Sequence, residues 1–168
     1  MAITPETRDY RTFEMRALDT GEEDKQYRVE GYAAVFDEET VLYEYDGIEY
    51  KEVIDRSAFT GAEMRDVVMN YNHGGKPVAR TKNGTLQLTV DTRGLRISAD
   101  LSGTEEGRRL YEEIRGGYLD QMSFAFTVNK QEYDRAKHLR RITGFKRVFD
   151  VAAVDIPAYD GTSIAARS

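Results

Sequence analysis

The sequence predicts a mainly β (α+β) protein: a closed or strongly curved antiparallel β-barrel of about seven strands with a few peripheral helices. Short stretches of alternating apolar and polar residues recur along the chain, with turn signals between them, and one stretch alone has clear helical spacing. Because strand and helix signals do not alternate along the chain, a doubly wound parallel sheet is not expected.

The first half of the chain predicts four β stretches and one short helical or loop segment. Residues 27–36 alternate small residues with larger or charged ones, which is typical of a strand. Residues 41–54 are rich in Tyr, Val and Ile around Asp46-Gly47, which predicts a hairpin. A short helical or loop segment is expected over 57–65, followed by a short apolar strand at 67–71.

The second half predicts another hairpin, one helix and a long β region. Alternation over 86–101 around Asp91–Gly94 predicts the hairpin. Ser102 and Glu105 have the spacing of a capping box, so a helix is expected there, ending at Gly116-Gly117. Residues 122–128 and 142–154 are read as strands, with a charged loop or hairpin tip over 131–141 and a stop at Pro157.

The 168 residues are expected to form one domain with ragged ends: a polar arm over 1–26, with one strand around 12–17, a folded β domain over 27–160 and a flexible tail over 161–168. The absence of cysteine excludes disulfides and thiolate chemistry. A net charge of −6 argues against nucleic-acid binding. No apolar run approaches a membrane span and the N-terminus lacks signal-peptide features, so a soluble intracellular protein is expected.

Few residues have the pattern of a reactive site, and the common phosphate, dinucleotide and zinc-protease motifs are absent from the sequence. His73 follows an apolar strand and precedes two glycines, which suits either a general base or an ordinary turn residue. By strand alternation, Ser123 points away from the face that carries Met122, Phe124 and Phe126. It is either a nucleophile or an ordinary strand serine.

Two carboxylates in the last apolar stretch are candidates for a partner of histidine. Asp150 is the more enclosed of the two, and either a histidine or an arginine such as Arg80 or Arg147 would satisfy it. Asp155 lies nearer the end of the strand and could equally form a turn before Pro157. His138, in a charged run, is read as a solvated loop residue.

Seven segments of the chain, in the order in which they occur, resemble segments of the prohead (capsid maturation) proteases of tailed bacteriophages. These are serine proteases related in fold to the herpesvirus assemblins. The resemblance runs from about Val29 to Ala165. The segments are Val29–Phe36, Ile54–Phe59, Tyr71–His73, Ala79–Thr81 with Gly84–Leu86, Asp91 with Gly94-Leu95, Met122–Phe126 and Asp150–Tyr159.

The resemblance implies a herpesvirus-protease-like fold and a serine endopeptidase with Ser123 as nucleophile, His73 as general base and Asp150 as third residue. This chain has Asp150-Val151-Ala152 where the family usually shows Glu-Val-Ser, and Ala79 where it shows Gly. Ala158-Tyr159 do not reproduce the arginine pair of the herpesvirus enzymes, so the oxyanion donors stay unassigned.

The resemblance also implies substrates, partners and a location. The substrates are the scaffolding protein or the scaffold segment of the major capsid protein, together with the protease's own termini. Other copies of the protease are expected partners, and the location is the immature prohead in the host cell cytoplasm. No cofactor, nucleic acid or membrane is expected. Two other functions stay open: a catalytically inactive β-barrel assembly or scaffold module on the same fold, and a metal-assisted hydrolase that uses His73 and His138.

Overall fold

The computed structural model describes residues 8–18 and 26–154, which form eleven strands, one 3₁₀ turn and one α-helix. The elements are β1 (Asp9–Glu14), β2 (Arg16–Ala17), β3 (Arg28–Val35), β4 (Thr40–Tyr45), β5 (Ile48–Ile54), β6 (Val68–Tyr71), β7 (Gly74–Arg80), η1 (Thr81–Asn83), β8 (Leu86–Val90), β9 (Gly94–Asp100), α1 (Glu105–Arg115), β10 (Gln121–Asp134) and β11 (Leu139–Ala153).

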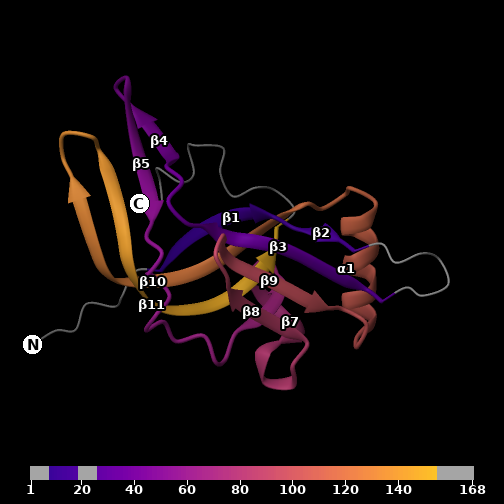
Figure 1. Cartoon of the computed structure of the whole chain (residues 1–168). Helices are drawn as coiled ribbons and strands as arrows, with labels where there is room; N and C mark the ends of the chain where they lie inside the picture. The colour runs from indigo at the N-terminus through magenta and orange to yellow at the C-terminus, as the bar shows by residue number, and fades with distance from the viewer. Residues whose placement is uncertain (1–7, 19–25, 155–168) are drawn as a thin grey trace, which may run out of the picture.

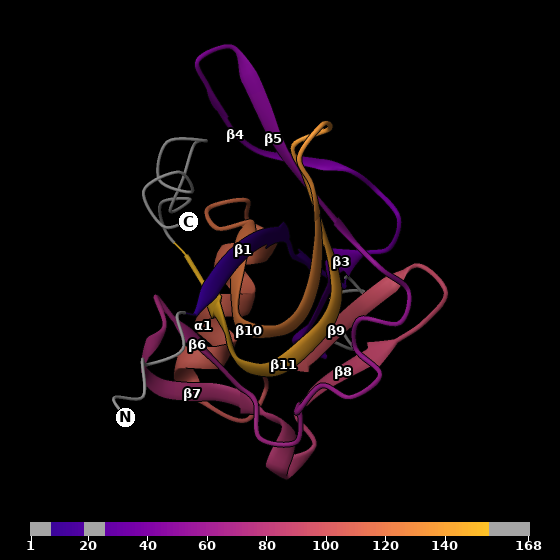
Figure 2. The ribbon, with the colours of Figure 1, turned by 90° about the vertical axis from the view of Figure 1, so that its left-hand side faces the viewer.

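The strands form two sheets, and the long hairpin of β10 and β11 is the centre of the larger one (Figure 1). In that seven-stranded sheet β1 pairs with β10, while β11 pairs with β5 near its start and with β6 near its end. The smaller sheet has the order β2-β3-β9-β8. Figure 2 shows the β10–β11 ribbon curling strongly, with α1 beside it.

The mainly β prediction is confirmed, but a closed antiparallel barrel of about seven strands is wrong. Within the described residues β1 and β4 are edges of the large sheet, so the curled sheet does not close on itself. β11 is also parallel to both β5 and β6, because each of these strands reaches it by a crossover rather than by a hairpin. One α-helix is present where a few were expected.

Register shifts in the β10–β11 ribbon separate the part of β11 that pairs with β5 from the part that pairs with β6. The pairing of β10 with β11 is interrupted by irregularities between Ala125 and Gln131. Bulges of this kind bend a strand and increase its twist. The ribbon is therefore much longer than the strands predicted over 122–128 and 142–154, and the predicted loop over 131–141 is mostly paired strand on either side of the tip.

In the hydrophobic core, aromatic rings of β10 and β11 meet a ring from the segment before β6. Phe59 stacks on Phe145 with ring centroids 4.4 Å apart, and Phe126 meets Phe145 edge-on at 4.9 Å. α1 covers this core with Leu110, Tyr111 and Ile114. Each large side chain buried in this way contributes about 1.5–3 kcal/mol.

The local predictions succeed where the turn chemistry is explicit. The hairpins β4–β5 and β8–β9 and the short strand β6 form as predicted, and Asp46-Gly47 turns with both φ angles positive. α1 ends at Gly116-Gly117 as predicted, but its N-cap is Thr104 rather than Ser102, because the Thr104 hydroxyl accepts the Gly107 N–H. Residues 57–65 form turns rather than a helix.

The range 1–26, taken from sequence as a polar arm, contains β1 and β2. Phe13 and Met15 from this range are buried in the core. The predicted tail 161–168, Pro157 and Asp155 lie outside the described residues. No helix in the described part of the chain is long and apolar enough to cross a membrane.

Candidate active site

The four neighbouring strands β1, β10, β11 and β6 place the candidate residues in two adjacent rows. In one row Tyr10 faces Ala125, Ala125 faces Asp150, and Asp150 faces Val68. In the next row Thr12 faces Ser123, Ser123 faces Ala152, and Ala152 faces Asn70. Because residues that face each other across a ladder lie on the same side of a sheet, Ser123 and Asp150 project from one face of neighbouring strands.

The opposite face of these strands carries the hydrophobic core. Met122, Phe124, Val151 and Met69 alternate with the residues of the two rows and are fully buried in the core. Their packing fixes the register of β10, β11 and β6, since a slip of one residue would send these apolar side chains to the wrong face. The core therefore holds Ser123 and Asp150 in place from behind.

His73 reaches the same face from the turn between β6 and β7. Tyr71 pairs with Gly74, and the two turn residues Asn72 and His73 have φ of 51° and 59°. This backbone is the tight two-residue turn that favours Asn and Gly. The sequence suggested that the glycines after His73 make the turn, but the left-handed conformation falls on His73 itself, a conformation that is uncommon for such a side chain.

The imidazole of His73 is hydrogen-bonded to Asp150. Its Nδ1 lies 2.6 Å from Oδ1 of Asp150, and the two side chains are 23% and 14% exposed. An ionised carboxylate only accepts hydrogen bonds, so Nδ1 is the donor, and in the neutral imidazole Nε2 is then the ring nitrogen with the lone pair. This is the tautomer that a general base needs. Arg80 and Arg147, the other partners considered for Asp150, interact instead with Asp66 and with the Phe149 ring.

The contact with Tyr10 shows where the His73 imidazole lies over the sheet. Its ring meets the His73 ring edge-on, with centroids 5.0 Å apart and planes at 73°. Tyr10 and Asp150 flank Ala125 in the ladder, so an imidazole in contact with both lies over β10 at Ala125. Ser123 is two residues away on the same face. Ala125 and Ala152 are fully buried, and their small side chains leave room for the ring.

Ser123 itself is buried, and its hydroxyl is unpaired. The residue is 1% exposed, and Oγ has no hydrogen-bond partner among the described residues. The structure thus forms the His73–Asp150 hydrogen bond but not one between Ser123 and His73. In unliganded enzymes such bonds are often long and tighten only with substrate.

The remaining candidates do not join this cluster. His138 lies at the far tip of the β10–β11 ribbon, where its ring contacts that of Tyr50 at 5.0 Å. Among the described residues no three histidine, aspartate or glutamate side chains are grouped so that they could hold a metal ion. Asp155 lies outside the described residues.

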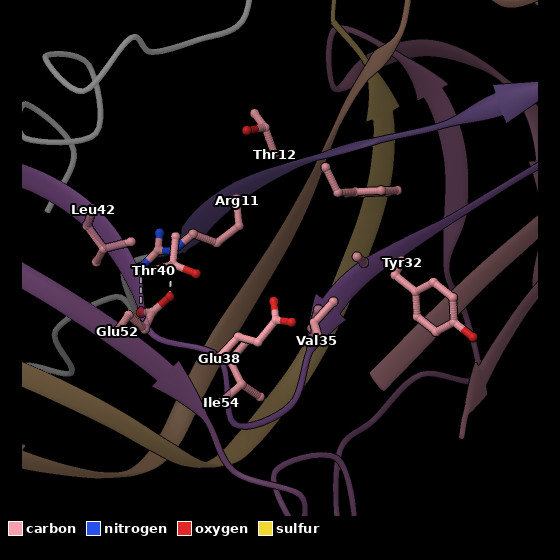
Figure 3. A pocket seen from close by; sticks show the side chains of 12 residues that line it. Arg11, Thr12, Tyr32, Val35, Glu38, Thr40, Leu42, Glu52 and Ile54 are labelled. Atoms are coloured by element: carbon pink, nitrogen blue, oxygen red, sulfur yellow. Dashed lines mark hydrogen bonds and ion pairs between the residues drawn. The ribbon is translucent and has the colours of Figure 1, made fainter. Parts of the chain in front are cut away.

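A separate pocket of about 190 Å³ lies between β1, β3 and β5 (Figure 3). Its main polar groups are paired with each other: Glu52, 4% exposed, accepts hydrogen bonds from Arg11 at 2.8 and 2.9 Å. Arg140 contacts the same carboxylate at 3.2 Å. This cluster ties β1, β5 and β11 together, and the pocket contains neither His73, Ser123 nor Asp150.

Sequence reasoning missed Tyr10 and Asn70. Tyr10 falls in the range taken for a polar arm, although the alternation of Tyr10 and Thr12 with Arg11 and Phe13 is a strand signal that could have indicated it. Asn70 belongs to a strand that was predicted. Its closeness to Ser123 depends on the pairing of β6 with β11, which no local pattern encodes.

Comparison with known families decides the broader class. The sequence model described as caudovirus prohead serine protease matches residues 11–168, which is nearly the whole chain. This chain belongs to the caudovirus prohead serine protease family. Membership in this prohead protease family implies a serine peptidase of phage capsid maturation, with capsid or scaffold proteins as substrates inside the prohead. No curated protein and no solved structure matches the chain, so the herpesvirus-protease-like fold stays a prediction.

Proposed function

We propose that this chain is a serine endopeptidase in which Ser123 is the nucleophile, His73 the general base and Asp150 the group that orients the base. One observation supports this assignment most strongly. The 2.6 Å bond from His73 Nδ1 to Asp150 Oδ1 lies on the sheet face that also carries Ser123. The family to which the chain belongs supplies the reaction type.

The reaction follows from the protonation of the imidazole. Nε2 of His73 takes the proton of the Ser123 hydroxyl as Oγ attacks the carbonyl carbon of a peptide bond. The tetrahedral intermediate collapses to an ester of Ser123, and His73 returns the proton to the departing amine. Water, deprotonated by His73, then hydrolyses the ester. Throughout, the Asp150 carboxylate stabilises the positive charge on the imidazole.

The attack requires a small rearrangement of the resting site. The Ser123 hydroxyl is unpaired, and the imidazole lies over the neighbouring Ala125. For the attack, rotation of the serine side chain about its Cα–Cβ bond and a tilt of the imidazole around the Asp150 hydrogen bond must bring Oγ and Nε2 within hydrogen-bond distance. Both movements preserve the strand register, because the core residues on the other face do not take part.

The proposed substrates are the scaffolding protein or the scaffold segment of the major capsid protein, and the protease's own termini. The site of action is the immature prohead in the host cell cytoplasm. Cleavage there would remove scaffold from the shell and make assembly irreversible. The net charge of −6 suits a protein that does not bind the genome.

A reactive probe tests the assignment directly. Wild-type protein is incubated with diisopropyl fluorophosphate, and intact mass with peptide mapping locates the adduct. We expect one adduct on Ser123, none in Ser123→Ala, and a rate at least about 10²-fold lower in His73→Ala. Labelling of a different serine, or equal labelling of the His73→Ala variant, would contradict the proposed roles.

One observation favours a second candidate function. The buried, unpaired Ser123 hydroxyl is also what a catalytically inactive assembly module on this fold would show. The same experiment separates the two functions, because an inactive module leaves Ser123 unlabelled and cleaves no peptide in a mixed-sequence library.

A further inference from the structure

Asn70 is a buried polar residue beside the proposed nucleophile whose hydrogen bonding is incomplete. Its residue exposure is 6%, and within the part of the chain that the structure describes its side-chain oxygen Oδ1 has no hydrogen-bond partner. Such atoms are rare in folded proteins, because an unpaired buried acceptor loses its water without compensation. A hydrogen-bond donor from a bound ligand would therefore satisfy this oxygen.

The position of Asn70 indicates where that donor comes from. Asn70 and Ser123 stand on either side of Ala152 in one row, on the same face of the sheet. Neighbouring strands are about 4.8 Å apart, so the two backbones are separated by roughly 10 Å. Ala152 contributes only a methyl group between them. Both flanking side chains have an unpaired oxygen, so a single polar ligand lying across the row would satisfy both.

We propose that Asn70 is a substrate-binding residue that hydrogen-bonds the main chain of the peptide next to the bond attacked by Ser123. A carboxamide matches a peptide group, since Oδ1 accepts from its N–H while Nδ2 donates to a carbonyl. Any movement that lets a peptide reach the buried Ser123 hydroxyl also uncovers its neighbour across Ala152. The inference rests on the proposed function, because it requires a peptide at Ser123.

The choice of variant exploits the unpaired oxygen. Asn70→Leu keeps the approximate size of the side chain but removes the acceptor, so it should raise the melting temperature by about 2–4 °C. At the same time it should lower kcat/KM for peptides by about 10–100-fold, mainly through KM. A residue with a purely structural role would not show an increase in stability together with a loss of peptide turnover.

Thr127→Val is the matched control. Thr127 lies on the same strand as Ser123, is 3% exposed, and its Oγ1 is also unpaired, but it faces Arg147 and lies outside the Ser123 row. This variant should gain stability in the same way and keep wild-type peptide cleavage. Asn70→Ala serves as a second variant in case the branched leucine disturbs the fold.

Two reactions distinguish binding of the peptide from support of the catalytic residues. The first is cleavage of a fluorogenic peptide that wild-type enzyme selects from a mixed-sequence library. The second is phosphonylation of Ser123 by diisopropyl fluorophosphate, a reagent without a peptide bond. We expect both Asn70 variants to react with the fluorophosphonate within about threefold of wild type while peptide cleavage falls at least about tenfold.

An equal fall in both reactions would overturn the proposal and make Asn70 a support of His73 or Ser123. Unchanged peptide cleavage in Asn70→Leu and Asn70→Ala would overturn it as well. If wild-type protein shows neither cleavage nor labelling, the proposed function itself fails. That outcome is recognisable because it does not depend on any Asn70 variant.

Discussion

The two halves of the β10–β11 ribbon have the same strands and the same antiparallel pairing but opposite surroundings. In the site half, residues 121–127 of β10 and 147–153 of β11, nearly every residue of β10 is buried, and β1 and β6 extend the sheet on both sides. In the arm half, residues 130–134 and 139–142, the β10 residues are exposed, and the ribbon projects from the body with β4 and β5 (Figure 1).

A tyrosine–histidine contact occurs in both halves. Tyr10 meets His73 in the site half, and Tyr50 meets His138 in the arm half, each with ring centroids 5.0 Å apart. Within residues 8–18 and 26–154, only the first histidine also has a carboxylate, Asp150, on its ring nitrogen. The difference shows that a contact between a histidine and a tyrosine does not by itself indicate a candidate active site in this protein. What distinguishes the site half is a sheet that continues on both sides, with Ser123 and Asp150 on one of its faces and His73 bonded to Asp150 there.

The sharpest test of this comparison removes the alcohol. Ser123→Ala should lower peptide cleavage by about 10⁴-fold or more, because no other group can form the acyl-enzyme. Among the described residues the Ser123 hydroxyl has no hydrogen-bond partner, so its removal should leave the fold intact, as checked by circular dichroism. Tyr133→Ala on the exposed arm half should cleave like wild type. Normal cleavage by Ser123→Ala would show that Ser123 in the site half is not the nucleophile.

The second test changes the acid. Asp150→Asn should reduce kcat by about 10²–10⁴-fold, because an amide can donate to Nδ1 and hold the imidazole in the wrong tautomer. The matched variant is Asp134→Asn at the ribbon tip, where Oδ1 accepts the Lys137 N–H at 3.1 Å. We expect that variant to keep full activity in the same assay. Similar rates for Asp150→Asn and wild type would mean that Asp150 only pairs with His73.

Sequence indicated the local parts of this ribbon better than their assembly. Strand alternation put Ser123 opposite Met122 and Phe124, and Asp46-Gly47 encoded its own turn, because both depend on residues adjacent in the chain. The parallel pairing of β11 with β5 and β6 joins segments about 80 residues apart and has no local signal.

The site shows the same limit. The resemblance to a family named Ser123, His73 and Asp150, and the structure places His73 against Asp150. Only the structure identifies Tyr10 and Asn70. Each lies on a different strand, and strand pairing in the sheet brings each of them near Ser123. Their position depends on non-local packing, which no local pattern in the sequence encodes.

A third, smaller effect is expected from the aromatic contacts. Tyr10→Ala removes an edge-on ring contact of a kind that contributes about 0.5–1.5 kcal/mol. With His73 less well held, kcat should fall by about 2–10-fold. Tyr50→Ala removes the corresponding contact of His138 and should leave kcat unchanged. If both variants lose activity equally, the two halves are coupled, and the contrast between them does not hold.

The smallest effect concerns the junction between the halves. Glu63 brackets Arg147 of β11, with its N–H donating to Lys146 O at 2.9 Å and its carbonyl accepting the Val148 N–H at 3.0 Å. The side chain and main-chain N–H of Arg65 lower the pKa of the Glu63 carboxyl from 4.5 to about 2. Because the folded-state pKa is lowered, this interaction stabilises the fold at neutral pH and is lost as pH falls through about 2.

Arg65→Gln should therefore raise the pKa of Glu63 part of the way back to 4.5, because the main-chain N–H bond of residue 65 remains. Carbon-detected NMR titration of the Glu63 carboxyl measures this directly. Peptide cleavage at neutral pH should not change, since the bracket around Arg147 is made by main-chain atoms. A loss of cleavage would show that side-chain charge at the junction, and not strand register alone, holds the site half in place.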